Sequence, residues 1–130
     1  MSSNPDRNTP EIEGTFFCFP VKANVVIPTG VIVQLDDAGM AQPGTQGSGL
    51  ICVGRAESRV EGGETDGASR ITVKRGVFRY ENAGDITAAD INGPCYVHGE
   101  ATVANANSNP DRSLCGVVMG VEPEGVWVRI

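Results

Sequence analysis

Hydrophobic and polar residues alternate along the C-terminal stretch of the chain, residues 114–130. Before a turn at residues 122–125, one apolar series occupies every second position, namely Cys115, Val117, Met119 and Val121. After the turn a second series follows, namely Val126, Val128 and Ile130. Alternation with a period of two on both sides of a Pro/Gly turn predicts a β-hairpin with one face on a core. We therefore expect residues 114–130 to form two strands of the fold.

Short apolar runs separated by turn residues predict further strands. They are expected at residues 15–19, 25–27, 31–35, 50–56, 69–80, 95–97 and 101–103. In the longest run, residues 69–80, the apolar positions change face after Gly76, which predicts a β-bulge. The one helix signal lies at residues 87–91, where Thr87 and Asp90 would form a short capping box. The pattern predicts an all-β, barrel-like fold of short antiparallel strands with one helical turn.

The segment before the first predicted strand has too few apolar side chains to fold by itself. In residues 1–14, Ile12 is the only apolar residue beyond Met1. We interpret this segment as a flexible N-terminal arm, followed by a single domain over residues 15–130. Such an arm is either a frayed terminus or a strand that is added to the sheet edge of a partner.

Composition and charge narrow the class of protein. The chain has 130 residues, 17 of them glycine and 8 proline, which suits one domain with many turns between short strands. Its formal net charge is -6, which argues against binding to nucleic acid or to anionic membranes. The basic residues near one predicted strand are interpreted as its solvated face: Arg70, Lys74, Arg75 and Arg79.

The chain shows no signal for a membrane span or a secretory leader. No apolar run approaches the length of about 18 residues that a spanning helix needs, and residues 1–14 contain no apolar core of a signal peptide. We expect a protein that is made and kept in the cytoplasm unless lysis releases it. In a reducing compartment its four cysteines are expected to be free thiols: Cys18, Cys52, Cys95 and Cys115.

No grouping of residues predicts catalysis. His98 is the sole histidine, and we interpret it as a residue of a hairpin tip rather than as a general base. Cys95 and His98 have a spacing seen in metal sites, and Cys115 would have to join them from another strand to bind zinc. This grouping is kept as the hypothesis of a small metal-assisted hydrolase. The favoured expectation is a protein without enzymatic activity and without a cofactor.

Trp127 is the candidate for an interface residue on the folded body. It should point away from the face formed by Val126, Val128 and Ile130. A tryptophan on the outer face of a hairpin can anchor an interface. Alternatively, its indole covers Gly116 or Gly120 on the neighbouring strand within one molecule. The sequence leaves these two interpretations open.

The order of elements from Ile71 onward resembles a known family. The matching series is Val73–Phe78, Thr87–Ile91, Pro94–Val97, Ala101–Val103, Cys115–Val118 and Gly125–Ile130. It resembles the head decoration proteins of tailed bacteriophages, also called capsid cement proteins, and Val25–Ala56 matches more loosely. The resemblance implies a small β-rich fold of the β-tulip kind with no enzymatic activity.

The resemblance also implies a location and partners. Proteins of this family sit on the outside of the expanded capsid, often as trimers, and clamp neighbouring major capsid subunits through an N-terminal arm. We therefore expect the major capsid protein as partner, a homo-oligomer with a trimer favoured, and the virion exterior as location after synthesis in the host cytoplasm. The expected capsid contacts are Thr9, Pro10, Ile12, Thr15 and Phe16, with Trp127 in self-association.

The alternative function is a non-enzymatic binding module, such as a tail or baseplate accessory domain with a carbohydrate ligand. Carbohydrate sites usually present several exposed aromatic side chains beside carboxylates. With four Phe, two Tyr and one Trp, the chain is poor in aromatic residues, which counts against this function.

Overall fold

The computed structural model describes residues 5–108 and 111–130, and nearly all of its regular structure is β. The strands are β1 (Phe16–Pro20), β2 (Val26–Ile27), β3 (Ile32–Leu35), β4 (Ala41–Pro43), β5 (Ile51–Ala56), β6 (Val60–Glu61), β7 (Arg70–Lys74), β8 (Val77–Asn82), β9 (Pro94–Val97), β10 (Thr102–Ala104), β11 (Leu114–Glu122) and β12 (Gly125–Arg129). One 3-10 turn, η1 (Ala88–Asp90), is the helical element of the described part. The predicted all-β fold with a short helical turn is confirmed.

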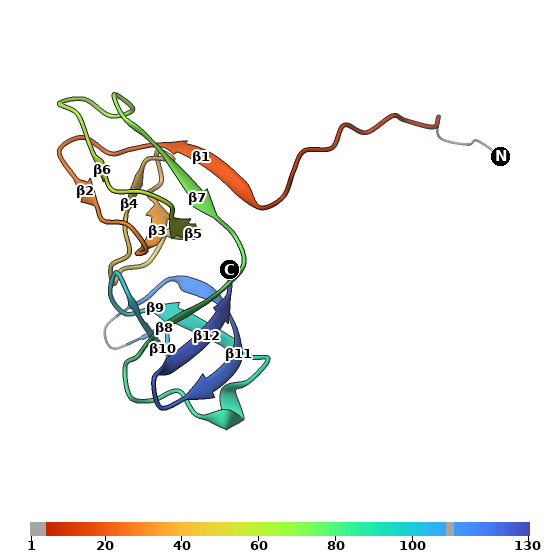
Figure 1. Cartoon of the computed structure of the whole chain (residues 1–130), viewed down its shortest axis with the longest axis vertical. Helices are drawn as coiled ribbons and strands as arrows, with labels where there is room; N and C mark the ends of the chain where they lie inside the picture. Colours follow the sequence, from red (N-terminus) through yellow and green to blue (C-terminus); the bar gives the residue numbers. More distant parts are fainter. Residues whose placement is uncertain (1–4, 109–110) are drawn as a thin grey trace.

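The strands form two sheet systems that lie one above the other in Figure 1. The upper system is a five-stranded sheet in the order β1-β7-β5-β3-β4, accompanied by the pair β2-β6. The lower system is a closed barrel in the order β10-β8-β12-β11-β9. Paired strands are antiparallel except β8 and β10, which run parallel. Closing the barrel leaves it without a free sheet edge, whereas the five-stranded sheet retains edges at β1 and β4.

Each sheet system encloses its own group of buried side chains. The barrel core consists of Ile32, Tyr80, Ile86, Cys95, Val97, Val103, Cys115, Val118, Val126 and Val128. The core of the five-stranded sheet consists of Val21, Ile27, Val31, Val33, Ala41, Val53, Ala56, Ile71 and Val73. Valine and isoleucine dominate both cores because branched side chains pack well on a pleated surface. The scarcity of aromatic residues thus leads to two small aliphatic cores.

The expectation of one bulged strand over residues 69–80 is wrong. The segment contains two strands in different sheet systems: β7 pairs with β1 and β5, whereas β8 pairs with β12 and β10. Ile71 and Val73 are buried in the sheet core and Tyr80 is buried in the barrel core. The change of apolar face after Gly76 therefore marks the crossing of the chain from one core to the other.

The predicted C-terminal hairpin is present, but the inward face of its first strand differs from the prediction. β11 has two register irregularities: one at Leu114/Gly116 in its pairing with β9, and one at Val118/Gly120 in its pairing with β12. Val118 therefore reaches the barrel core, while Met119 is 40% exposed. An extra residue in one strand re-aims the side chains that follow it, which simple alternation does not anticipate.

Two smaller predictions are confirmed, and two short strands, β4 and β6, were missed. The N–H of Thr87 donates to Asp90 Oδ2 at 2.8 Å, and the N–H of Ala89 donates to Thr87 Oγ1 at 3.3 Å, so the capping box exists. β9 and β10 form the expected hairpin around His98. β4 was not predicted; it pairs with β3 through a turn in which Asp36 Oδ1 accepts the N–H of Met40 at 3.0 Å.

Because β11 approaches β12 closely, we expect substitution by alanine to have different effects at two glycines of β11. A Cβ on Gly116 would collide with the carbonyl oxygen of Arg129, whereas a Cβ on Gly120 would lie 3.6 Å from Trp127 Cδ1, an ordinary contact. We expect Gly116→Ala to lower the free energy of unfolding by roughly 1–3 kcal/mol, and Gly120→Ala by less than about 0.5 kcal/mol. Urea unfolding followed by circular dichroism measures both, and equal losses would contradict this pairing geometry.

Candidate interaction surfaces

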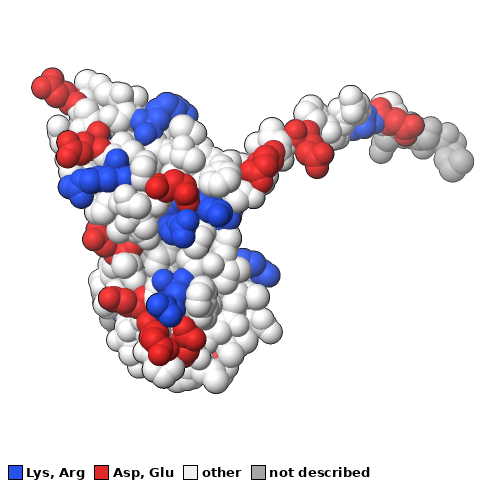
Figure 2. Space-filling view, in the orientation of Figure 1, with Lys and Arg blue, Asp and Glu red and all other residues white. Residues whose placement is uncertain are grey.

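The arm projects away from the folded body (Figures 1 and 2). Residues 5–14 belong to no strand or helix, and all of them are exposed. Ile12 is 75% exposed, the largest fraction among the exposed large hydrophobic side chains of the described residues. Thr9 and Pro10 lie on the same extended segment. Three of the five expected capsid contacts, Thr9, Pro10 and Ile12, are therefore exposed to solvent.

The folded body begins to hold the chain at Thr15. The carbonyl oxygen of Thr15 accepts the N–H of Arg75 at 2.8 Å. Glu13 Oε2 accepts the N–H of Thr15 at 2.9 Å and the N–H of Phe16 at 3.1 Å. Hydrogen bonds from Thr15, first from its side chain and then from its backbone, lower the pKa of the Glu13 carboxyl group. Thr15 therefore lies at the base of the arm. There the Glu13 carboxylate, by accepting two backbone N–H groups, fixes the chain at the start of β1.

The arm continues into a strand at an open sheet edge. Within the described residues β1 pairs with β7 alone, so its other side is an open sheet edge, on which the N–H of Phe16 is bonded to Glu13 and the carbonyl oxygen of Cys18 to Arg70. Phe17 and Phe19 pack against the sheet core, while Phe16 is 49% exposed. The ammonium group of Lys74 lies 5.5 Å from the centroid of the Phe16 ring. Such an edge, with alternate side chains free for contact, can accept a strand from another protein.

The four basic residues do not form one strand face as expected. Arg70 and Lys74 lie on β7, whereas Arg79 lies on β8 in the barrel. Arg70 donates to the carbonyl oxygen of Cys18 at 3.4 Å, and Arg79 forms an ion pair with Glu122 at 3.1 Å. The grouping is divided because the chain changes sheet systems between β7 and β8.

Trp127 points outward from the barrel, as predicted, and is 38% exposed. It pairs with Gly120 across β11 and β12, and its Cδ1 and Cβ atoms lie over that glycine. The guanidinium of Arg79 lies 5.7 Å from the centroid of its ring. Part of the indole thus covers Gly120, and the rest remains available for contact.

Trp127 also borders a groove of about 590 Å³ that residues of the barrel form together with Gly30 and Arg55, which lie outside the barrel strands. Its lining residues are Gly30, Arg55, Val77, Phe78, Arg79, Tyr80 and Trp127. None of these lining residues carries a carboxylate, and the guanidinium of Arg55 already lies 4.2 Å from the centroid of the Phe78 ring. Guanidinium groups thus lie over the Phe78 and Trp127 rings, and the carboxylates beside the groove, Glu57 and Glu122, are paired with Arg55 and Arg79. The groove therefore lacks the free aromatic faces and free carboxylates that are typical of a carbohydrate site.

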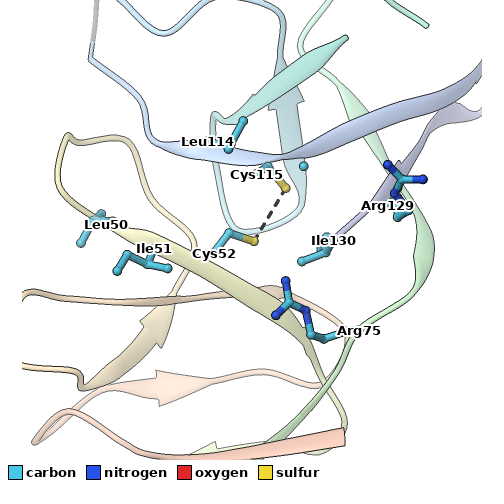
Figure 3. Close-up of a pocket in the computed structure, with 9 residues that line it drawn as sticks. Leu50, Ile51, Cys52, Arg75, Leu114, Cys115, Arg129 and Ile130 are labelled. Carbon is cyan, nitrogen blue, oxygen red and sulfur yellow. Dashed lines mark hydrogen bonds between the residues drawn. The ribbon is translucent and has the colours of Figure 1, made fainter. Parts of the chain in front are cut away.

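A second groove of about 400 Å³ lies where the five-stranded sheet meets the barrel (Figure 3). It is lined by Leu50, Ile51, Cys52, Arg75, Leu114, Cys115, Gly116, Arg129 and Ile130. The Sγ atoms of Cys52 and Cys115 are 3.9 Å apart. Sequence reasoning missed this pair, because nothing in the local pattern around either cysteine indicates that β5 and β11 come together.

The hypothetical zinc grouping is not formed. Cys95 and Cys115 are buried in the barrel core, whereas His98 lies at the hairpin tip with its Nδ1 3.4 Å from Gln46 Nε2. Among residues 5–108 and 111–130, no three or more His, Cys, Asp or Glu side chains are arranged to hold a metal ion. In the same residues, no helix has the length and apolar character that crossing a membrane requires.

Comparison with known proteins gives no relative from which a function could be transferred. No family model matches the chain, and neither a curated protein nor a solved structure matches it. The function is therefore argued from the surfaces described above.

The carboxylate at the base of the arm predicts a pH-dependent junction. Because the pKa of Glu13 is lowered in the folded protein, its hydrogen bonds are fully present above the ordinary carboxyl pKa and are lost as pH falls through the lowered value. We expect the amide resonances of Thr15 and Phe16 to shift together in this acidic range when the pH is titrated by NMR.

Glu13→Gln should abolish this titration, whereas the neighbouring variant Glu11→Gln should retain it. Amide shifts that persist in Glu13→Gln would show that another group controls the junction.

Proposed function

We propose that this protein is a capsid decoration protein that binds the outer surface of an expanded phage head and cements neighbouring major capsid subunits. The observation that carries the proposal is an exposed arm that continues directly into a strand at an open sheet edge. The resemblance of the series from Ile71 onward supports the same function. Residues of the arm and of β1 would then make one continuous contact.

The reach of the arm suits a clamp between subunits. Ten residues, 5–14, span at most roughly 33–36 Å when extended. This length is comparable to the diameter of a small domain, about 30 Å. An arm from a body seated on one subunit can therefore reach a neighbour. A protein that bridges subunits binds the assembled shell better than free subunits, and it stabilises the shell by that difference in affinity.

The contact residues have distinct proposed roles. Ile12 is the apolar anchor, because it is the one large hydrophobic side chain of the described arm and is highly exposed. Thr9 and Pro10 extend the contact toward the N-terminus, with Pro10 restricting the backbone to extended conformations. Phe16 adds an exposed ring at the beginning of β1, and Thr15 fixes the direction in which the arm leaves the body.

Self-association is proposed to use the barrel. Trp127 and Val77 are exposed on the outer side of its strands, Val77 by 46%. Exposed apolar side chains around an aromatic residue are typical of interface centres. A trimer formed in this way would leave the arms free to reach separate capsid subunits. The net charge of -6 disfavours attachment to nucleic acid and to anionic membranes, in keeping with a place on the virion exterior after synthesis in the host cytoplasm.

The proposal predicts that removal of the arm separates folding from binding. A chain lacking residues 1–14 should keep its circular dichroism spectrum and its thermal transition, because both cores lie beyond the arm. The shortened chain should no longer co-sediment with expanded empty heads made from its own phage's major capsid protein. Unchanged co-sedimentation would contradict binding through the arm.

A point variant tests the anchor in the full chain. Ile12→Asp places a charge where we propose an apolar contact, and it should weaken binding to heads at least tenfold. Ile91→Asp is the matched control, because Ile91 is also exposed, at 42%, and follows η1 at the end of the barrel away from the arm (Figure 1). Equal effects of the two substitutions would contradict a specific role of Ile12.

A further inference from the structure

Two thiols from different sheet systems meet at the groove between the sheet and the barrel. Cys52 belongs to β5 of the five-stranded sheet, and Cys115 belongs to β11 of the barrel. Their Sγ atoms are 3.9 Å apart, and both residues line the groove (Figure 3). Cys52 is half-buried, whereas Cys115 is 5% exposed. The groove therefore gives solvent access to a pair of adjacent thiols.

We propose that Cys52 and Cys115 are a redox-active pair that closes into a disulfide and covalently joins the five-stranded sheet to the barrel. The oxidant is a low-molecular-weight disulfide such as oxidised glutathione. A disulfide has a sulfur–sulfur bond of about 2.05 Å, so the two sulfur atoms must approach each other by about 2 Å. We expect side-chain rotation to supply most of this movement.

The surroundings favour Cys52 as the attacking thiol. The hydrogen bond with Cys115 lowers the pKa of the Cys52 thiol, and the nearby charge of Arg75 acts in the same direction. The hydrogen bonds with Cys52 and Cys95, together with burial, raise the pKa of the Cys115 thiol. Arg75 and Arg129 line the same groove, and the charge of Arg75 acts on Cys52, so a negatively charged oxidant is attracted to it.

The exchange balances in two steps. The Cys52 thiol loses a proton, its thiolate attacks one sulfur of oxidised glutathione, and one glutathione thiolate leaves. The Cys115 thiol then loses its proton and attacks Cys52 Sγ, and the second glutathione thiolate leaves. Two protein thiols are oxidised to one disulfide, and one molecule of oxidised glutathione is reduced to two of glutathione, which take up the two protons.

The other two cysteines are placed differently. Cys18 is exposed on β1. The Cys95 thiol also forms a hydrogen bond with Cys115, but Cys95 is 0% exposed inside the barrel. A bond between Cys95 and Cys115 would join two strands that are already paired, since β9 and β11 are neighbours. Cys52 and Cys115 lie in different sheet systems, and their Sγ atoms are within 3.9 Å of each other, so a bond between them would connect the two systems.

The biological role of this bond rests on the proposed function, although the chemistry does not. Virions leave a reducing cytoplasm for oxidising surroundings, and disulfides persist in the latter. A force on the capsid-bound arm would act on the five-stranded sheet, to which β1 belongs, whereas the proposed self-association surface lies on the barrel. A bond between these halves would keep the clamp from being pulled apart after release.

Peptide mapping of the unmodified chain tests the proposal. The reduced protein is incubated with oxidised glutathione, its remaining thiols are alkylated in denaturant, and the linked peptides are identified by mass spectrometry. We expect a Cys52–Cys115 link, with Cys95 alkylated. We also expect a rise in Tm of roughly 10 °C, reversed by dithiothreitol.

Three results of the mapping would overturn the proposal: alkylation of both Cys52 and Cys115, a Cys95–Cys115 link in place of the expected one, or glutathione retained on Cys52. The rise in Tm should survive Cys95→Ser and disappear in Cys115→Ser. Because the mapping uses the natural chain, poor folding of a variant leaves the test intact. It also needs no capsid, so its outcome is independent of whether the protein binds heads.

Discussion

The alternating side chains around β3 pack into both cores and hold the two halves of the molecule together. Val31 and Val33 are buried in the core of the five-stranded sheet, while Ile32, between them, is buried in the barrel core. The N–H of Ile32 donates to the carbonyl oxygen of Glu100 in the β9–β10 turn at 2.8 Å. Because successive residues of a strand point to opposite faces, a single short segment serves two cores. Each core alone is small, so the stability of each half depends on this shared segment.

This shared segment gives the proposed function a rigid base. The arm and β1 belong to the five-stranded sheet, whereas Trp127 belongs to the closed barrel. The surface proposed to bind the capsid therefore lies on one half of the molecule, and the surface proposed for self-association lies on the other. The two halves are packed together. The groove with Cys52 and Cys115 lies at the same junction, which makes it the place where a covalent bond would change the mechanics of the whole molecule.

Local patterns predicted the features that neighbouring residues determine, and they failed where distant contacts decide. The capping box of Thr87 and Asp90 and the turn between β11 and β12 depend on residues a few positions apart. The division of β7 from β8 depends on which sheet each strand joins, which periodicity does not encode. The pairing of Cys52 with Cys115 depends on contacts across the whole fold. Of the interaction surfaces, the arm and the outward position of Trp127 followed from the sequence, and the grooves did not.

The central claim is that the arm and the β1 edge fasten this protein to a capsid. Cryo-electron microscopy of expanded phage heads, assembled from the major capsid protein encoded beside this chain and saturated with the full chain, tests this most directly. The account predicts that the body lies on the outer surface and that residues 9–16 follow the surface of a major capsid subunit as ordered density. Heads without bound protein, or protein attached through the barrel with its arm in solvent, would contradict it.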